Sequence, residues 1–334
     1  MKILFCDMEF DYGVRQNGIN YIGKAFLKAF QANGCIVETF YYDDFLKQSQ
    51  PVDTLQQLLL RRADEIKPDL IFFPTFTNQF SFETLDRLKA NYFTVGWFGD
   101  DTWRFENYTR LYAPHYSLCV TTDKFSVEKY RKLDQRNVVL SQWAAIDEEK
   151  PAPEFDGKYL YDVSFVGQFN HYRQWFVNML EKQNIKVECF GRGWKNGMVD
   201  DERMKNIFLR SKISLNIANS LCRDIRFLLS KPTMLARYFF TPKNMGQIKA
   251  RNFEIPYYGG FQITDYFPGI EDYFEIGREI ACFKDVDEAA MLISFYLEQD
   301  DLRQTMIGRA YKRARASHGY VNRMKEILEA VQRR

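Results

Sequence analysis

The sequence QIKARNFEIPYYGGFQITD, residues 247–265, predicts a helix, a break at Gly259 and Gly260, and a short strand over residues 261–264. A helix that ends at a glycine turn and leads into a strand is a recurring unit of α/β proteins. The stretch therefore indicates an α/β fold, provided that the same alternation continues elsewhere in the chain.

Two cations, Lys249 and Arg251, lie near the start of this helix and precede its one acid, Glu254. Free backbone N–H groups at a helix start suit a diphosphate when cations stand beside them, and a carboxylate can accept hydrogen bonds from sugar hydroxyls. Gly260, in the turn that follows, belongs to the same predicted site. The alternative interpretation is an ordinary amphipathic helix with a glycine C-cap.

Length and composition limit the remaining possibilities. At 334 residues, the chain suits two domains of roughly 150 residues each. A net charge of +2 argues against a dedicated nucleic-acid binder, which normally carries a strong basic excess. The 30 Phe and 20 Tyr residues are interpreted as core filling, with stacking platforms for bases or sugars as the alternative.

The chain shows no sign of export or of a metal centre. Its six cysteines form no C-x-x-C pair, which is typical of buried thiols in a reducing compartment. The start, MKILFCDMEFD, turns acidic too early for a signal peptide, and no apolar run is long enough for a membrane span. The three histidines lack ligand spacing. We expect a cytoplasmic protein without a cofactor or metal, in at most peripheral contact with the inner membrane face.

Strand-like and helix-like segments alternate through the first half. Strands are predicted at 2–6, 36–40, 70–73, 93–97, 118–121 and 138–140, and helices at 19–30, 55–66 and 81–90. This rhythm indicates parallel strands joined by crossover helices, and ligands sit at the carboxyl ends of such strands.

Acidic residues follow two of these strands. Asp100 and Asp101, in GWFGDDTWRF, could orient or deprotonate an acceptor hydroxyl, while the alternative for Asp101 is a helix N-cap. Asp7, Glu9 and Asp11 form a second cluster. Alternating carboxylates can bind Mg²⁺, but no further ligand is evident there.

A charged stretch at 147–158, DEEKPAPEFDGK, marks the best domain boundary. A second alternation follows, with strands at 162–166, 187–190 and 213–217 and helices at 171–182 and 204–211. Residues 218–244 are predicted to be irregular, and residues 287–334 to form three helices. The first strand runs through Gly167 into a helix whose first turn carries Arg173, a weak phosphate-binding signal.

Two further features of the second half suggest ligand contact. Gly191, Gly193 and Trp194 follow a strand, where small residues and an aromatic ring would let a nucleotide base approach the backbone. Asn216 lies at the end of the next strand. The irregular segment is rich in cations, which attract a diphosphate or simply form a solvated basic face. These cations are Arg223, Arg226, Lys231, Arg237 and Lys243.

Five segments together resemble the CgeB-like glycosyltransferases of the GT-B group, which are related to glycosyltransferase family four. The segments are FVGQ with Arg173, CFGRGW, SKISLNI, KARNFEIPYYGGFQITD and EIACFKDVDEAAMLISFYL, and the resemblance covers residues 160–316 well. It implies two Rossmann-like domains facing each other across a cleft, with C-terminal helices crossing back. The implied division is an acceptor-side domain at 1–146, a linker at 147–158, a nucleotide-sugar domain at 159–316 and a C-terminal helix at 317–334.

The resemblance also implies roles for single residues. Glu254 matches the acid that binds the donor ribose; Arg173, Lys249 and Arg251 match the cations around the diphosphate; and Gly167 matches its backbone cradle. Residues 191–194 match the base-binding region. Family-four relatives usually carry a second glutamate where this chain has Gly246, so that role does not transfer and the stereochemistry stays open.

The leading hypothesis is a metal-independent, hexosyltransferase-like enzyme that moves a sugar from a nucleotide-diphosphate sugar to a hydroxyl acceptor. A polysaccharide, a lipid-linked saccharide or a protein would each fit as the acceptor, and cell-surface polysaccharide biosynthesis is one setting. Two alternatives stay open on the same scaffold: a nucleotide-sugar epimerase or hydrolase, and a degenerate transferase that only binds its ligand.

Overall fold

The computed structural model of the chain describes residues 1–47, 52–148, 155–218, 224–241, 243 and 246–333. It divides into two compact units. Unit 1 comprises Met1–Trp143 together with Tyr320–Arg334, and unit 2 comprises Ala144–Gly319. Part of the predicted linker, residues 149–154, and the cation Arg223 lie outside the described residues.

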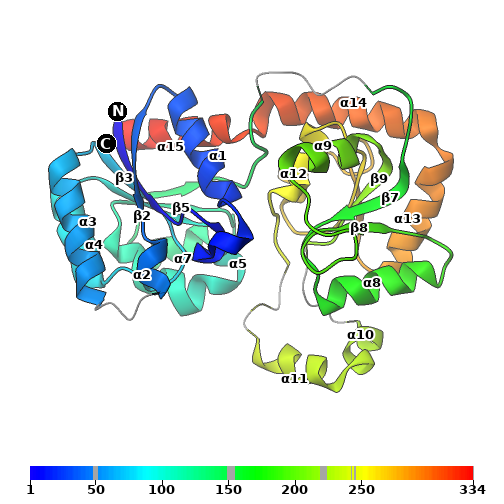
Figure 1. Cartoon of the computed structure of the whole chain (residues 1–334), viewed down its shortest axis with the longest axis horizontal. Helices are drawn as coiled ribbons and strands as arrows, with labels where there is room; N and C mark the ends of the chain where they lie inside the picture. Colours follow the sequence, from blue (N-terminus) through cyan, green and yellow to red (C-terminus); the bar gives the residue numbers. More distant parts are fainter. Residues whose placement is uncertain (48–51, 149–154, 219–223, 242, 244–245, 334) are drawn as a thin grey trace. The chain divides into compact units, whose positions relative to one another are not determined.

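Unit 1 is a parallel sheet with strand order β2-β1-β3-β4-β5-β6 (Figure 1). Its strands are β1 (Lys2–Asp7), β2 (Ile36–Tyr41), β3 (Leu70–Pro74), β4 (Thr94–Phe98), β5 (Leu118–Thr121) and β6 (Val138–Leu140). Its α-helices are α1 (Tyr21–Ala32), α2 (Asp43–Lys47), α3 (Val52–Ile66), α4 (Phe82–Asn91), α5 (Asp101–Arg104), α6 (Arg110–Tyr112), α7 (Val127–Arg131) and α15 (Tyr320–Gln332). Short turns of other helix types are η1 (Asp11–Gly13), η2 (Arg15–Asn17), η3 (Phe105–Thr109) and η4 (Ala113–His115).

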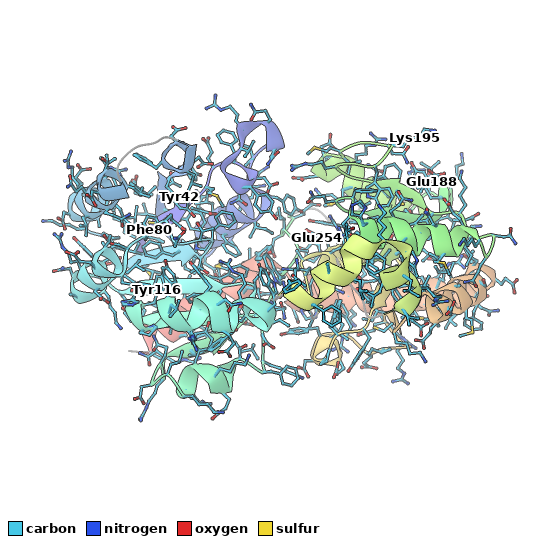
Figure 2. All side chains as sticks on the ribbon, turned by 90° about the horizontal axis from the view of Figure 1, so that it is seen from below. Tyr42, Phe80, Tyr116, Glu188, Lys195 and Glu254 are labelled. Carbon is cyan, nitrogen blue, oxygen red and sulfur yellow. The ribbon has the colours of Figure 1, made fainter. Side chains whose placement is uncertain are left out.

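Both faces of this sheet are buried, as is usual when crossover helices cover parallel strands. Leu4 and Cys6 belong to one core cluster with α3 and α4 residues, and Phe5 faces the other way and contacts Phe26 and Phe30 of α1. Aromatic rings fill much of the first cluster, as three labelled in Figure 2 illustrate: Tyr42, Phe80 and Tyr116. The many Phe and Tyr residues therefore serve core packing to a large extent.

The C-terminal helix α15 returns to unit 1 and packs on α1. The ring of Tyr320 meets that of Phe26 edge-on at 5.2 Å, and Asn33 Nδ2 donates to the carbonyl of Val321 at 3.0 Å. The predicted crossing back of the C-terminal helices is thereby confirmed.

Unit 2 holds a second parallel sheet, with strand order β11-β10-β9-β7-β8 (Figure 1). Its strands are β7 (Tyr161–Val166), β8 (Glu188–Phe190), β9 (Ser211–Asn216), β10 (Gln262–Asp265) and β11 (Ala281–Phe283). Its helices are α8 (His171–Glu181), α9 (Asp201–Leu209), α10 (Ile225–Ser230), α11 (Pro232–Phe240), α12 (Arg251–Tyr257), α13 (Val286–Glu298) and α14 (Asp300–Ser317), with the turn η5 (Ile270–Asp272). Helices α8 and α13 pack together, and α12 packs with α14.

The α/β prediction is confirmed, and the predicted strands are present with ends shifted by at most two residues. One expectation is wrong: residues 218–244 are not wholly irregular, because they contain α10 and α11. Each of these helices is too short to show a sustained helical periodicity in the sequence. Among the described residues, no helix is long and apolar enough to cross a membrane.

Candidate functional site

The strand order of unit 2 reverses between β7 and β9. We call the carboxyl ends of these two strands the ledge of unit 2. The chain leaves β7 toward β8 on one side and later adds β9 on the other, so neighbouring connections diverge at this point. Crevices at such a reversal of strand order are the usual ligand sites of open α/β sheets. Helix α12 also starts at this edge, because it carries the chain from the end of β9 back to the beginning of β10.

Arg173 lies across this ledge. The N-cap residue Asn170 accepts a hydrogen bond from the backbone N–H of Arg173 at 2.8 Å, which fixes the first turn of α8. The guanidinium donates from Nε to the carbonyl of Ile217 (2.8 Å) and from Nη1 to the carbonyl of Gln168 (2.6 Å). The side chain thus joins the residues that follow β7 and β9, so its charge is held at the carboxyl ends of these two strands.

The electrostatic environment of Arg173 is unfavourable for a cation. Burial lowers its pKa to about 10, the charge of Asp265 opposes that shift, and the charge of Arg251 adds to it. The two guanidinium groups therefore lie within electrostatic reach of each other. Asp265 partly compensates the charge of Arg173, and Glu254 pairs with Arg251. An anionic ligand would relieve their repulsion.

A buried polar network fixes the start of α12 on the sheet. Thr264 Oγ1 accepts hydrogen bonds from Asn216 Nδ2 (3.1 Å) and Asn252 Nδ2 (3.0 Å). Asp265 Oδ1 accepts from the backbone N–H of Ala218 at 3.1 Å. Because these groups are almost fully buried, breaking the network would leave unsatisfied polar atoms. Asn216 thus acts here as a structural tie between β9, β10 and α12.

Helix α12 carries the ion pair between Arg251 Nη1 and Glu254 Oε2, 2.6 Å apart. The Arg251 guanidinium also lies over the ring of Phe208, 5.3 Å from its centre. Glu254, labelled in Figure 2, is almost completely buried. The backbone N–H of Lys249 donates to Asn252 Oδ1 at 3.0 Å, so this residue directly precedes the fixed first turn.

Glycines let the backbone after β7 and β8 approach closely. Gly191 has φ +125°, and a Cβ atom there would lie 2.3 Å from the carbonyl oxygen of Gly167. Gly193 also has a positive φ, and a Cβ atom there would lie 2.7 Å from Cβ of Phe169. Trp194 Nε1 donates to that same Gly167 carbonyl at 2.9 Å, and its ring meets Phe169 edge-on. Any residue other than glycine at these two positions would have to displace the neighbouring atoms.

The structure therefore brings most of the residues predicted for the donor site to one edge of unit 2. Gly260 is not among them, because it precedes β10 and so lies at the opposite edge, where a Cβ atom would meet Ile255 and Phe208. Asp265, Thr264 and Asn252 were missed. Asp265 directly follows the strand predicted at 261–264, and this position at a carboxyl strand end was the signal that could have found it.

In unit 1, Asp101 is fully buried and saturated with hydrogen bonds. Its carboxylate accepts from Thr109 Oγ1 (2.6 Å), Thr121 Oγ1 (2.6 Å) and the hydroxyl of Tyr130 (2.7 Å). Burial raises its pKa to about 6, and the three hydroxyl donors oppose the shift. These contacts suit a residue that fixes α5 and β5.

Asp100 differs from its neighbour. It occupies the N-cap position of α5 without a side-chain capping bond, and it is only partly buried. Of the two predicted acids, Asp100 is the one that solvent or a ligand reaches.

Asp7 ends β1 and is also buried. Its oxygens accept from the backbone N–H of Met8 (2.8 Å) and from Asn20 Nδ2 (3.0 Å). Burial, with a smaller contribution from the charge of Asp43, raises its pKa to about 8. A Cβ atom at position 23 would lie 2.5 Å from Asp7 Oδ2, so Gly23 is required beside it.

Comparison with known families gives a match to part of unit 2. Residues 173–329 match the sequence model of a family described as "Glycosyl transferase-like". The match spans slightly less than half of the chain, and it contains Arg173, Arg251 and Glu254. A comparison with curated proteins found no match.

Solved structures of the GT-B type resemble the whole chain. HepE from Anabaena in complex with UDP has a TM-score of 0.60 at 14% identity, with 100% of both chains covered. Sucrose-phosphate synthase from Thermosynechococcus elongatus has a TM-score of 0.68 at 9% identity, with 99% of each chain covered. A glycosyltransferase from Rickettsia africae has a TM-score of 0.64 at 10% identity, covering 99% of this chain and 98% of that one. At these identities the likeness shows the fold, which is of the GT-B type with two Rossmann-like sheets.

Proposed function

We propose that this protein is a glycosyltransferase that moves a sugar, a hexose in the first instance, from a nucleotide-diphosphate sugar to a hydroxyl acceptor. The observation that carries the proposal is the cationic edge of unit 2. There the Arg173 guanidinium is held between the carbonyls of Gln168 and Ile217, and Arg251 begins helix α12. The family match over the same residues supports it. The five sequence motifs favour the CgeB-like group within this class.

The ledge has the chemistry that the leaving group requires. When the bond between sugar and diphosphate breaks, negative charge grows on the nucleoside diphosphate, and preorganised cations stabilise that charge. Arg173, Arg251 and Lys249 would supply them, with the close backbone turn at Gly167 as a cradle. Because side chains provide the charge, the proposed reaction needs no metal ion and no cofactor.

The nucleoside would lie beside the diphosphate. The turn at 191–194 follows β8, next to Gly167, which makes Gly191, Gly193 and Trp194 the proposed base-binding region. Glu254 would accept hydrogen bonds from the ribose hydroxyls, and its ion pair with Arg251 holds its carboxylate in place. Asn216 would act indirectly, by holding the start of α12.

On the acceptor side, Asp100 would orient or deprotonate the acceptor hydroxyl. Asp101 is assigned as a positioning residue, since its carboxylate is already occupied by three hydroxyls. The proposed acceptors are a polysaccharide, a lipid-linked saccharide or a protein, and the proposed location is the cytoplasm or its membrane surface, consistent with free cysteines among the described residues.

The deciding experiment measures nucleoside diphosphate binding and its release from UDP-, GDP-, ADP- and dTDP-sugars. UDP-glucose comes first, because HepE has been solved with UDP and with UDP-glucose. We expect one nucleotide class to bind and turn over. Arg251→Ala should lower release about 100-fold, because a charge-assisted contact to the leaving group is lost. Glu254→Ala should weaken binding of the nucleoside diphosphate but not of pyrophosphate.

The matched control is Arg278→Ala. Arg278 belongs to the same unit, is well exposed, and pairs with Glu275 near the start of β11, at the opposite edge of the sheet. It should leave release unchanged. Binding without product would favour the degenerate, ligand-binding alternative, and donor consumption without any acceptor would favour the epimerase or hydrolase. A folded protein that responds to no donor would contradict the proposal.

A further inference from the structure

Helices α10 and α11 form a hairpin inserted between β9 and α12. Figure 1 shows both helices projecting from the rest of unit 2. They pack on each other, and each is short, with α10 at Ile225–Ser230 and α11 at Pro232–Phe240. Helices this short are marginal in water, so contacts outside their own backbone must stabilise them.

One face of α10 supplies the attachment to unit 2. Phe227 is buried, and its ring contacts Tyr172 (5.3 Å) and Trp175 (5.6 Å) of α8. Arg226 pairs with Asp224 (2.6 Å) and with Asp287 of α13 (2.9 Å). These contacts hold the hairpin at its base.

The outer faces of the hairpin are apolar and exposed. Ile225 and Leu229 are 68% and 71% exposed, and their four-residue spacing puts them on one side of α10, away from Phe227. On α11, Phe239 is 72% and Phe240 88% exposed, with Leu235 at 40%. A group of large apolar side chains on the surface marks an interaction site.

The charges of this segment are almost all positive. Asp224 is the one acid in the sequence of residues 224–243, and it is paired with Arg226. The same sequence also contains Lys231, Arg237 and Lys243. Since the whole chain has a net charge of only +2, this positive charge is a local feature.

We propose that the α10–α11 hairpin docks this protein onto an anionic lipid surface. Its exposed Leu and Phe side chains enter the boundary between headgroups and acyl chains, and the neighbouring cations meet anionic headgroups. This combination of an apolar face with Lys and Arg is that of helices that lie in a membrane interface. A second copy of the chain fits less well, because a symmetric contact would bring like charges together.

The place of the hairpin in the fold gives docking a consequence. The chain leaves the ledge at the end of β9 and returns to it at the start of α12, so docking holds the edge with Arg173 close to the lipid. If the proposed function is right, this location favours a lipid-linked or membrane-associated acceptor. The docking itself does not rest on that function.

The test is co-sedimentation of the full chain with vesicles, without any sugar donor. We expect binding to phosphatidylcholine vesicles containing about 30% phosphatidylglycerol, little binding to pure phosphatidylcholine, and weaker binding in high salt. The double variant Phe239→Ser/Phe240→Ser should lower the bound fraction at least about tenfold, because it removes two interfacial aromatic side chains. Lys231→Glu/Lys243→Glu should abolish the preference for the anionic vesicles.

Phe295→Ser is the matched control, because Phe295 is a half-exposed aromatic residue on α13 of the same unit. It should bind vesicles as the unchanged protein does, and circular dichroism should show all variants folded. Absence of binding to anionic vesicles, or binding that survives the double Phe variant, overturns the proposal. So does a dimer in solution that the double Phe variant dissociates, since the patch would then belong to a second copy. If the unchanged protein binds vesicles but turns over no sugar donor, the proposed glycosyltransferase function is refuted and the docking proposal is not.

Discussion

The two units share a strand order but differ in charge at the equivalent ledge. In each sheet the first strand lies between the second and the third, β1 between β2 and β3, and β7 between β8 and β9. Unit 1 ends its first strand with the buried carboxyl of Asp7. Unit 2 presents Arg173 at the corresponding place, within electrostatic reach of Arg251.

Two further acids of unit 1 accept hydrogen bonds from groups of the same unit. Asp43 accepts hydrogen bonds from the backbone N–H groups of Glu9 and Phe10, at 2.6 and 2.9 Å, and so holds the loop after β1. Asp101 is saturated by three hydroxyls. The two units thus have the same strand order at this edge of the sheet. The charge of the side chains there determines which ligand each edge can bind. We therefore propose that the diphosphate binds to unit 2.

The strongest test of this assignment is Arg173→Ala. The variant should weaken UDP binding about 100-fold while changing uridine binding little, because charge-assisted contacts to the diphosphate are lost. Arg173→Lys should be intermediate, since a lysine keeps the charge but cannot bridge the carbonyls of Gln168 and Ile217. Isothermal titration calorimetry with both ligands gives the comparison.

The counterpart in unit 1 is Arg104→Ala. Arg104 is a cation on α5, with its guanidinium 4.2 Å from the ring centre of Tyr108. We expect UDP binding to remain unchanged in this variant. An equal loss of UDP affinity in both variants would break the distinction between the two ledges.

Gly191→Ala tests the close backbone approach in unit 2 through a loss of stability rather than a loss of affinity. The new Cβ atom would clash with the Gly167 carbonyl at a positive φ, so unfolding should become easier by about 2–4 kcal/mol. Gly197→Ala is the control, because Gly197 also has a positive φ but has no atom within 4 Å of its ideal Cβ. It should cost only about 1 kcal/mol. Equal losses in denaturant unfolding would show that backbone strain, rather than close approach, matters at Gly191.

The smallest effect concerns the buried acid of unit 1. The pKa of Asp101 rises from 3.8 to about 6 on folding, so between these values the folded protein holds a proton that the unfolded chain has released. This group therefore lowers the free energy of unfolding as the pH rises from about 4 to about 6, and adds no further change above that. The loss is at most about 3 kcal/mol, because a tenfold change in proton affinity is worth about 1.4 kcal/mol.

Asp101→Asn removes the titration and keeps the shape, since the three hydroxyls can rotate to donate or accept. Relative to the unchanged protein, the variant should gain stability as the pH rises through this window. Denaturant unfolding at several pH values measures the difference. A constant difference between pH 4 and pH 7 would show that Asp101 is ionised in the folded protein throughout.

Local sequence was sufficient for the strands of both sheets except β11, for which no strand was predicted. Buried parallel strands are continuous apolar runs, such as LIFF before Pro74, and glycines or prolines bound them. The helix around Glu254 was predicted from its cations and from Gly259, whose φ of +81° the structure confirms. Helices α10 and α11 were missed, because each is shorter than the window of about 11 residues in which helical periodicity can be recognised.

The sequence by itself determined the α/β class, the strand positions and a cationic helix start at Lys249 and Arg251. Only the tertiary structure decided that Arg173 joins the ends of β7 and β9, that Asp265 lies within reach of it, and that Asp101 is buried while Asp100 is not. The physical reason is that these properties depend on which strands become neighbours and on what covers each side chain. Neither is encoded in residue spacing along the chain, because sheet order and burial arise from contacts between distant segments.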